Sequence, residues 1–434
     1  MPATSLSTDL YELAMMAGYV ADGRHERTRA TFELFVRRLP RNRNYLIAAG
    51  LEQALTYLED LRFTDDEVEW LRGTPALAQV DEGFFAYLRG FRFTGDVWAM
   101  AEGTPVFPNE PLLRVTAPFP EAQLVETALL AIVSLQTTIA SKAARIVHAA
   151  GGRPVYEFGA RRAHGPEAAL FAARAAYMSG CAGTSYVEAG RRFRIPLSGT
   201  MAHSWVLAFE EEIASFRRYS DLFGDRAALL IDTYDTADAA RAIAASGLRP
   251  SAVRIDSGSL GALAREVRGI FDAHGLQDTR ILLSGDLDEH RIRRLIADGT
   301  PVDGFGVGTS LVTSEDAPAL SSVYKLVELH EDRRTRRVRK RSPSKVTWPG
   351  AKQIWRRPSG DVLALADEPP PETAQPLIEL VMQDGRRISP APPLDAIRRH
   401  CREACAALPS ALRQLDTGTP YPVRPSDTLA ELIA

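Results

Sequence analysis

Residues 252–259 read AVRIDSGS, a short apolar run that ends in Asp256, Ser257 and Gly258. The same form occurs five times between residues 153 and 325: an apolar run, then polar residues or glycine, then a helical pattern. The runs are residues 154–158, 227–231, 252–255, 280–283 and 302–307. Short apolar runs that alternate with amphipathic helices are typical of parallel β/α units.

The helices between these runs are predicted at residues 167–179, 236–245, 260–274 and 288–298. Each predicted helix stops at or just before a glycine, which is a common way to end a helix: Gly180, Gly247, Gly275 and Gly299. In an α/β barrel the carboxyl ends of the strands meet on one face, where active sites are built. Because all five runs end in polar or glycine residues, the sequence favours an α/β fold built on an irregular, TIM-like barrel over a doubly wound sheet.

The rest of the chain predicts an additional α+β domain. Residues 1–120 contain strand candidates at 30–36 and 95–100 and helix candidates at 8–19 and 48–60. Residues 326–434 become basic and then proline-rich, with a short strand at 377–382. We therefore expect an N-terminal α+β domain at 1–120, a barrel at 121–325, and a C-terminal segment at 326–434 that packs beside the N-terminal domain.

The composition is that of an ordinary globular protein. The 434 residues carry a net charge of −3, with 45% apolar and 25% charged residues, so nucleic acid is not expected as the main partner. Seven basic residues occur at 333–341 and predict a solvated strand or turn rather than a nucleic-acid patch.

A cytoplasmic location is expected. The chain has only three cysteines, Cys181, Cys401 and Cys405, which is typical of a reducing compartment. The first 20 residues make a poor signal peptide because Asp9 and Glu12 interrupt their apolar stretch. The longest apolar run, residues 128–140, contains polar side chains and is too short to span a bilayer, so no membrane association is predicted.

Two regions carry the chemistry of phosphate binding. Arg254, Asp256 and the turn at Gly258 lie at one strand end, where arginine and free backbone amides suit a phosphate; a salt-bridged turn is the alternative. Gly285 follows the next strand, and Gly308 and Thr309 follow the last one. Small residues allow a phosphate to approach the backbone, and barrels often bind phosphate at their last two strands.

Two further motifs suggest a nucleophile and an aromatic acid. His203 precedes a helix predicted at residues 204–222, and a neutral imidazole there is either a nucleophile or a helix cap. Phe158 and Arg161 lie in one loop, where a flat anion is expected to stack on the ring and pair with the guanidinium. The alternative is that Arg161 is an ordinary surface arginine that binds no ligand.

Taken together, these motifs resemble the nicotinate phosphoribosyltransferase family. The resemblance extends over nearly the whole chain through TDLYELAM (8–15), YLIAAGL (45–51), FGARRAHG (158–165), GTS (183–185), GTMAHS (199–204), VRIDSG (253–258), GVGT (306–309), KVTWPGAKQ (345–353) and YPV (421–423).

The resemblance implies a type II phosphoribosyltransferase that is usually a homodimer. By the family pattern, Phe158 and the partner subunit's Tyr11 sandwich the pyridine ring of nicotinate. Residues around the substrate are Arg161, Ser185 and Thr200. The phosphoribosyl group is held by Arg254, Asp256, Ser257, Gly285, Gly308 and Thr309. The family pattern further makes His203 a phosphohistidine, formed by ATP as co-substrate.

The expected reaction fits this assignment. Displacement of pyrophosphate from the ribose passes through a state resembling an oxocarbenium ion, which the carboxylates of Asp232 and Asp256 are placed to stabilise. Mg²⁺ is expected with the pyrophosphate, without assigned protein ligands.

Three alternatives remain at this point. The first is nicotinamide as substrate, for which the resemblance places an aspartate where this chain has Ser185. The second is quinolinate, whose second carboxylate calls for more basic residues around the ring. The third is a barrel without catalytic activity that serves as a ligand sensor.

Overall fold

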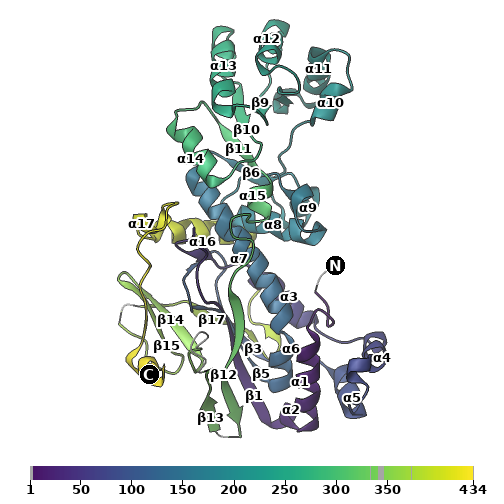
Figure 1. The fold of residues 1–434 in the computed structure, drawn as a ribbon, viewed down its shortest axis with the longest axis vertical. Helices are drawn as coiled ribbons and strands as arrows, with labels where there is room; N and C mark the ends of the chain where they lie inside the picture. Colours follow the sequence, from purple (N-terminus) through teal and green to yellow (C-terminus); the bar gives the residue numbers. More distant parts are fainter. Residues whose placement is uncertain (1–2, 333, 341–346, 373, 434) are drawn as a thin grey trace. The chain divides into compact units, whose positions relative to one another are not determined.

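The computed structural model describes residues 3–332, 334–340, 347–372 and 374–433. Contacts divide the chain into two compact units, which are described separately below. Unit 1 consists of residues 1–138 and 319–434, and unit 2 consists of residues 139–318 (Figure 1).

Unit 2 is built on a six-stranded parallel sheet. The strand order is β7-β6-β11-β10-β9-β8, so β7 and β8 are its two edges. The strands are β6 (Val155–Glu157), β7 (Gly183–Thr184), β8 (Ala228–Leu230), β9 (Ala252–Ile255), β10 (Arg280–Leu283) and β11 (Gly304–Val307). Every pairing is parallel, which brings the carboxyl ends of all six strands to one side.

The helices that follow the strands end where the glycines predict. These helices are α8 (Pro166–Met178), α12 (Thr236–Ser246), α13 (Leu260–Ala273) and α14 (Glu289–Ala297). Gly180, Gly247, Gly275 and Gly299 follow them with φ between +63° and +117°, a conformation that a side chain disfavours. Asp235 and Asp288 cap the starts of α12 and α14 through their side chains.

The structure differs from the sequence prediction at two places in unit 2. The helix predicted at 204–222 is split into α10 (His203–Leu207) and α11 (Glu212–Phe223). Acidic residues at 210–212 explain the break, because carboxylates stabilise the start of a new helix and not the middle of one. The prediction also missed β7, which is only two residues long and has no apolar run. Short helices complete the unit: η2 (Ala160–Arg162), α9 (Val187–Phe193), η3 (Gly224–Arg226) and α15 (Thr309–Val312).

Unit 1 joins both ends of the chain in one seven-stranded sheet. Its order is β13-β12-β1-β5-β3-β17-β18, all antiparallel. The strands are β1 (Thr28–Val36), β3 (Asp96–Met100), β5 (Pro111–Pro118), β12 (Ser322–Glu331), β13 (Arg334–Arg337), β17 (Ile378–Gln383) and β18 (Arg386–Arg387). The prediction of an irregular barrel with an α+β domain built from the N-terminal and C-terminal segments is thereby confirmed.

Smaller elements surround this sheet in unit 1 (Figure 1). One small sheet contains β16 (Gln375–Pro376), β14 (Lys352–Arg357), β15 (Gly360–Leu365) and β19 (Val423–Pro425), and another pairs β2 (Leu46–Ile47) with β4 (Pro105–Val106). The helices are α1 (Leu10–Ala21), α2 (Arg24–Arg27), α3 (Leu51–Asp60), α4 (Asp65–Arg72), η1 (Pro75–Leu77), α5 (Glu82–Gly90), α6 (Phe119–Leu124), α16 (Leu394–Ala407), α17 (Ser410–Arg413) and α18 (Asp427–Ile433).

Helix α7 (Glu126–Ala149) begins in unit 1 and ends in unit 2. It is longer than the apolar run at 128–140 and, among the described helices, the one whose length and apolar composition suffice to cross a membrane. However, 61% of its most apolar stretch is buried inside the protein. Such burial is also found in core helices of folded domains.

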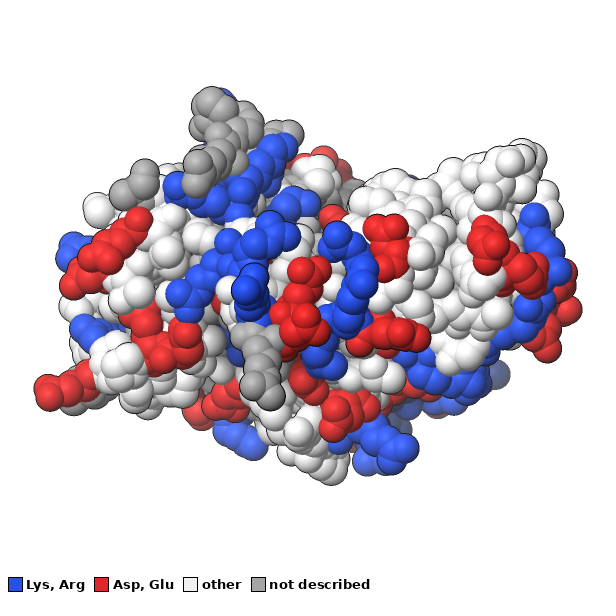
Figure 2. Space-filling model, turned by 90° about the horizontal axis from the view of Figure 1, so that it is seen from below, with Lys and Arg blue, Asp and Glu red and all other residues white. Residues whose placement is uncertain are grey.

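The basic segment forms the predicted exposed strand. All four residues of β13 are exposed, and Arg337 pairs with Glu328 and Asp367. Figure 2 shows Lys and Arg interspersed with Asp and Glu on the face seen from below. Arg333 and Arg341, like Lys345 of the quoted motif, lie outside the described residues.

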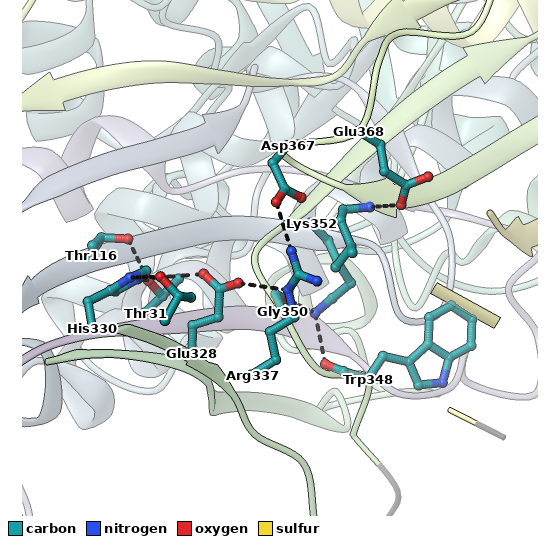
Figure 3. A network of polar contacts seen from close by, with 12 residues as sticks. Thr31, Thr116, Glu328, His330, Arg337, Trp348, Gly350, Lys352, Asp367 and Glu368 are labelled. Atoms are coloured by element: carbon teal, nitrogen blue, oxygen red, sulfur yellow. Dashed lines mark hydrogen bonds and ion pairs between the residues drawn. The ribbon is translucent and has the colours of Figure 1, made fainter. Parts of the chain in front are cut away.

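A buried lysine holds the small sheet of unit 1 against the large one. Lys352 Nζ lies 2.6 Å from Glu33 Oε2 and donates to the carbonyl oxygens of Trp348 and Gly350 at 2.9 and 2.7 Å. Figure 3 shows the Trp348 contact, with Arg337 between Glu328 and Asp367 nearby. Burial lowers the pKa of Lys352, and Glu33 opposes this shift.

Replacing Lys352 by Met is expected to destabilise unit 1 by about 3–5 kcal/mol, because it leaves Glu33 buried without its cation. Urea unfolding followed by tryptophan fluorescence measures this, since four of the five tryptophans lie in unit 1. Arg337→Met is the matched control: its ion pairs are partly exposed and are worth about 1 kcal/mol or less. Equal stability of the two variants would contradict the role given to Lys352.

Candidate active site

A cleft of about 470 Å³ lies at the carboxyl ends of the strands of unit 2. Five of the strands, or the turns that follow them, contribute to its walls, together with the segment that leads into α10. The lining residues are Phe158, Arg161, Arg162, Ser185, Gly199, Thr200, Met201, Ala202, His203, Arg254, Asp256, Ser284, Gly285, Asp286, Leu287, Gly306, Gly308, Thr309 and Ser310.

The ring of Phe158 lies directly on the backbone of Gly306. A Cβ atom on Gly306 would approach ring carbons of Phe158 to 2.4 and 2.6 Å, so any larger residue there would displace the ring. The backbone of Phe158 is fixed as well, because its N–H donates to the Val307 carbonyl at 2.8 Å. One wall of the cleft is thus an aromatic surface that glycine makes possible.

Glu157 fixes the loop that carries Ser185. Its Oε2 accepts a hydrogen bond from Thr184 Oγ1 at 2.5 Å, and its carbonyl accepts from Ser185 N at 3.0 Å. Burial raises the pKa of Glu157. Arg161 lies in η2, which follows Glu157 and Phe158 in the chain; it is exposed and donates to the Phe158 carbonyl at 3.3 Å. Ser185 and Arg161 therefore both border the aromatic wall.

The ends of β9 and β10 meet at a glycine. Gly285 has φ +88°, and a Cβ atom there would come within 1.7 Å of the Asp256 carbonyl oxygen. Ser284 Oγ donates to Asp256 Oδ1 at 2.5 Å. The Asp256 carboxylate is therefore held at the floor of the cleft, and only glycine fits at position 285.

Arg254 provides a half-buried cationic group of the cleft. Its Nη1 donates to Thr200 Oγ1 at 2.7 Å, and its Nε is buried without a hydrogen-bond partner in the described part of the chain. Burial lowers its pKa, whereas Asp256 and Asp232 raise it. A guanidinium with a free donor is suited to an anion.

Asp232 connects two of the loops without lining the cleft. Its Oδ2 accepts from Asp256 N at 2.9 Å and from Ser257 Oγ at 2.6 Å. The charge of Asp232 therefore acts on the cleft through Asp256 and Arg254.

His203 is the first residue of α10 and is half-buried. Its Nδ1 lies 3.1 Å from Thr233 Oγ1. The helix is not capped by a side chain, so the histidine is not a cap. Burial and the charges of Asp232 and Asp235 raise the pKa of Glu212, the first residue of α11, to about 7. One ring nitrogen of His203 is thus fixed by a hydroxyl, and the residue itself lines the cleft.

Ten of the residues singled out from the sequence line this one cleft: Phe158, Arg161, Ser185, Thr200, His203, Arg254, Asp256, Gly285, Gly308 and Thr309. Asp232 accepts one hydrogen bond from the Asp256 N–H and another from the Ser257 hydroxyl. Tyr11 lies on α1 of unit 1 and is 48% exposed.

Sequence reasoning assigned no individual role to Ser284, Asp286 or Gly306, although Ser284 and Asp286 flank Gly285 and Gly306 begins the motif GVGT. Ser284 and Gly306 act through contacts between different strands, and no local sequence pattern reveals such contacts. Met201 and Ala202 were missed because apolar residues beside a histidine carry no signal of their own.

The described residues contain no group of three or more His, Cys, Asp or Glu that could hold a metal ion. A cation in this cleft would therefore need oxygen atoms from a bound ligand in addition to a carboxylate such as Asp256.

Three family models match the chain in succession. The nicotinate phosphoribosyltransferase N-terminal domain matches residues 6–134, and the C-terminal domain of the same family matches residues 370–433. The C-terminal domain of quinolinate phosphoribosyl transferase matches residues 139–318, which is unit 2.

The chain is also similar to full-length proteins. It is 46% identical to a nicotinate phosphoribosyltransferase of Mycobacterium tuberculosis, with 99% of this chain and 93% of that protein covered. It is 46% identical to the nicotinate phosphoribosyltransferase of Bacillus subtilis, with 84% and 76% covered. The crystal structure of human nicotinic acid phosphoribosyltransferase superposes with a TM-score of 0.85 at 29% identity and covers 98% of this chain and 99% of that one. The chain therefore belongs to the nicotinate phosphoribosyltransferase family.

Proposed function

We propose that this protein joins nicotinate to phosphoribosyl pyrophosphate and forms nicotinate mononucleotide and pyrophosphate, as a step of NAD biosynthesis. ATP is hydrolysed to ADP and phosphate through a phosphohistidine at His203. The observation that carries this proposal is the cleft itself, in which an aromatic surface, a half-buried guanidinium, a carboxylate and a histidine meet at the ends of parallel strands.

The aromatic wall suits the pyridine ring. Phe158 offers one face for stacking, and the partner subunit's Tyr11 supplies the other face in a homodimer. Arg161 pairs with the carboxylate of nicotinate, while Ser185 and Thr200 offer hydroxyl donors around it. The exposed side chain of Tyr11 is compatible with a place in another subunit's site.

The floor of the cleft suits the phosphoribosyl group. Arg254 and Ser257 provide donors for phosphate or ribose oxygens, and Gly285, Gly308 and Thr309 expose backbone to them. Gly308 has no side chain to obstruct a phosphate, and Thr309 begins α15. The last two strands of a barrel are a frequent place for phosphate.

Asp256 and Asp232 stabilise the positive charge that develops at C1 of the ribose as pyrophosphate leaves. Asp256 acts directly from the floor, with its Oδ1 oriented by Ser284. Asp232 acts through its hydrogen bond to the Asp256 N–H. Asp256 is the carboxylate that would help to hold Mg²⁺, which would supply positive charge to the leaving pyrophosphate.

His203 accepts the phosphoryl group of ATP as a nucleophile. A phosphate on this residue changes the charge of the cleft next to Arg254 and Thr200, so substrate affinity depends on its presence. The protein works in the cytoplasm, in keeping with its three free cysteines.

Ser185 favours nicotinate over nicotinamide. A hydroxyl donates to a carboxylate, whereas an aspartate at this place would repel it and accept from an amide. Quinolinate carries a second carboxylate, which would need a second cationic partner beside the ring. Besides Arg161 and Arg254, Arg162 is the one arginine among the described lining residues.

The direct test supplies phosphoribosyl pyrophosphate and Mg²⁺ with nicotinate, nicotinamide or quinolinate, each with and without ATP. Mononucleotide and ADP are measured. We expect nicotinate to give the highest kcat/KM, with ADP formed alongside the product. Preference for nicotinamide or quinolinate would refute the substrate assignment, and the absence of product from all three bases would favour a non-catalytic ligand sensor.

His203→Ala is expected to abolish labelling of the protein by γ-³²P-ATP and to reduce ATP-dependent turnover at least a hundredfold, because no nucleophile remains. Acid-labile label and mononucleotide are both measured. His274→Ala is the matched control, since His274 is an exposed residue at the end of α13. Full ATP-dependent turnover in His203→Ala would refute the phosphohistidine but not the transferase.

A further inference from the structure

The turn between β10 and α14 forms one border of the cleft and has two left-handed residues in succession. Residues 284–287 line the cleft, and within them Gly285 has φ +88° and Asp286 has φ +44°. Residues with a side chain disfavour this conformation, although aspartate tolerates it better than most. The backbone of Asp286 therefore depends on support from the surrounding structure.

Arg291 on α14 supplies this support from outside the cleft. Its Nη1 donates to the carbonyl oxygen of Gly285 at 3.0 Å and to the carbonyl oxygen of Asp286 at 3.3 Å. Arg291 itself is not one of the described residues that line the cleft. One guanidinium nitrogen thus holds both peptide units of the left-handed turn.

The same two bonds fix the direction of the neighbouring N–H groups. All peptide bonds in the described residues are trans, and the C=O and N–H of a planar trans peptide point in opposite directions. Because the carbonyls of Gly285 and Asp286 face Arg291, the N–H groups of Asp286 and Leu287 point away from it. Within the described part of the chain, neither of these N–H groups donates a hydrogen bond. The turn therefore offers two free donors at the border of the cleft.

The positive charge of Arg291 strengthens these donors. A cation bound to a carbonyl oxygen polarises the peptide unit and makes its N–H a better donor to an anion. Successive N–H groups in turns of this kind form concave sites for phosphate. The carboxylate of Asp286 is exposed, so solvent screens its charge.

Helix α14 gives Arg291 a fixed base. The backbone N–H of Arg291 donates to the capping carboxylate of Asp288 at 2.6 Å. The next residue, Glu289, is fully buried and pairs with Lys142 Nζ at 2.6 Å and with Arg145 Nε at 3.0 Å on α7. Buried ion pairs are costly to break, so the first turn of α14 is held in place within unit 2.

We propose that Arg291 is a positioning residue for the phosphoribosyl donor, because it keeps the N–H groups of Asp286 and Leu287 directed at the phosphate oxygens of that donor. This inference rests on the proposed function, which places the phosphoribosyl group at Gly285. Arg291 does not touch the substrate, and it has no contact with the ring wall at Phe158 among the described hydrogen bonds. Its loss therefore weakens binding of the donor and not of the aromatic acid.

The test compares two substitutions of Arg291. Arg291→Met removes the donor and the charge but keeps an apolar chain, whereas Arg291→Lys keeps a cation that can donate. Arg294→Met is the matched control, since Arg294 is exposed on the same helix. Calorimetry measures the affinity for phosphoribosyl pyrophosphate without a base and, separately, for nicotinate, so neither result depends on turnover.

We expect Arg291→Met to bind phosphoribosyl pyrophosphate at least tenfold more weakly and nicotinate within twofold of the wild type. Arg291→Lys should bind the donor at least threefold more tightly than Arg291→Met, and Arg294→Met should match the wild type. In steady state, the KM for the donor should rise at least tenfold in Arg291→Met while kcat changes less than threefold.

Hydrogen exchange measured by mass spectrometry reports on the turn itself. In the wild type, phosphoribosyl pyrophosphate should slow amide exchange in a peptide that covers residues 284–288, because the N–H groups of Asp286 and Leu287 gain acceptors. This measurement needs no variant, and the absence of slowing at a saturating donor concentration would overturn the proposal.

A folded Arg291→Met protein with wild-type affinity for the donor would also overturn the proposal. Equal weakening of donor and nicotinate binding would do the same, since that pattern indicates general damage to unit 2. Donor binding that depends on Arg291, in a protein that forms no mononucleotide from any base, would refute the proposed function and leave the positioning role supported.

Discussion

The contact between the Phe158 ring and the backbone of Gly306 is the constraint on which the site depends. The ring of Phe158, which follows β6, packs so closely on Gly306 of the neighbouring strand β11 that a single Cβ atom would displace it. The ring therefore packs against β11 and forms a wall of the cleft. The Gly285 contact has the same effect on the floor, where it brings the Asp256 carbonyl and carboxylate to the neighbouring strand end.

These close approaches link the fold to the proposed chemistry. Parallel strands place every carboxyl end on one side, and glycines at two of those ends let the backbones approach a ligand. Between them stands Arg254, whose hydrogen bond to Thr200 ties β9 to the segment that carries His203. The groups proposed to bind the ring, the ribose phosphate and ATP are thus joined by direct contacts within unit 2.

Much of this architecture could be predicted from the sequence. Five apolar runs correspond to β6, β8, β9, β10 and β11, and the glycines that stop the helices adopt the expected positive φ. Local sequence patterns were sufficient for these elements, since the spacing of apolar residues and the conformational preference of glycine act within a few residues. The prediction of one continuous helix at 204–222 was wrong, because the three glutamates at 210–212 stabilise the start of a new helix rather than the middle of one.

The parts of the site that escaped prediction depend on contacts between distant residues. Ser284 orients Asp256 across two strands, and Asp232 acts through a backbone amide of another loop. Gly306 carries no signal of its own in the sequence, because the packing of the Phe158 ring against it is a contact between two strands.

The most direct measurement is the affinity of Gly306→Ala for nicotinate, determined by calorimetry beside Gly269→Ala. Gly269 lies in α13 of the same unit, and a Cβ atom there meets nothing within 4 Å. If the ring wall positions the aromatic acid, Gly306→Ala should fold normally and bind nicotinate at least tenfold more weakly, a loss of about 1.4 kcal/mol, while Gly269→Ala should match the wild type. A folded Gly306→Ala protein with wild-type affinity would contradict the account.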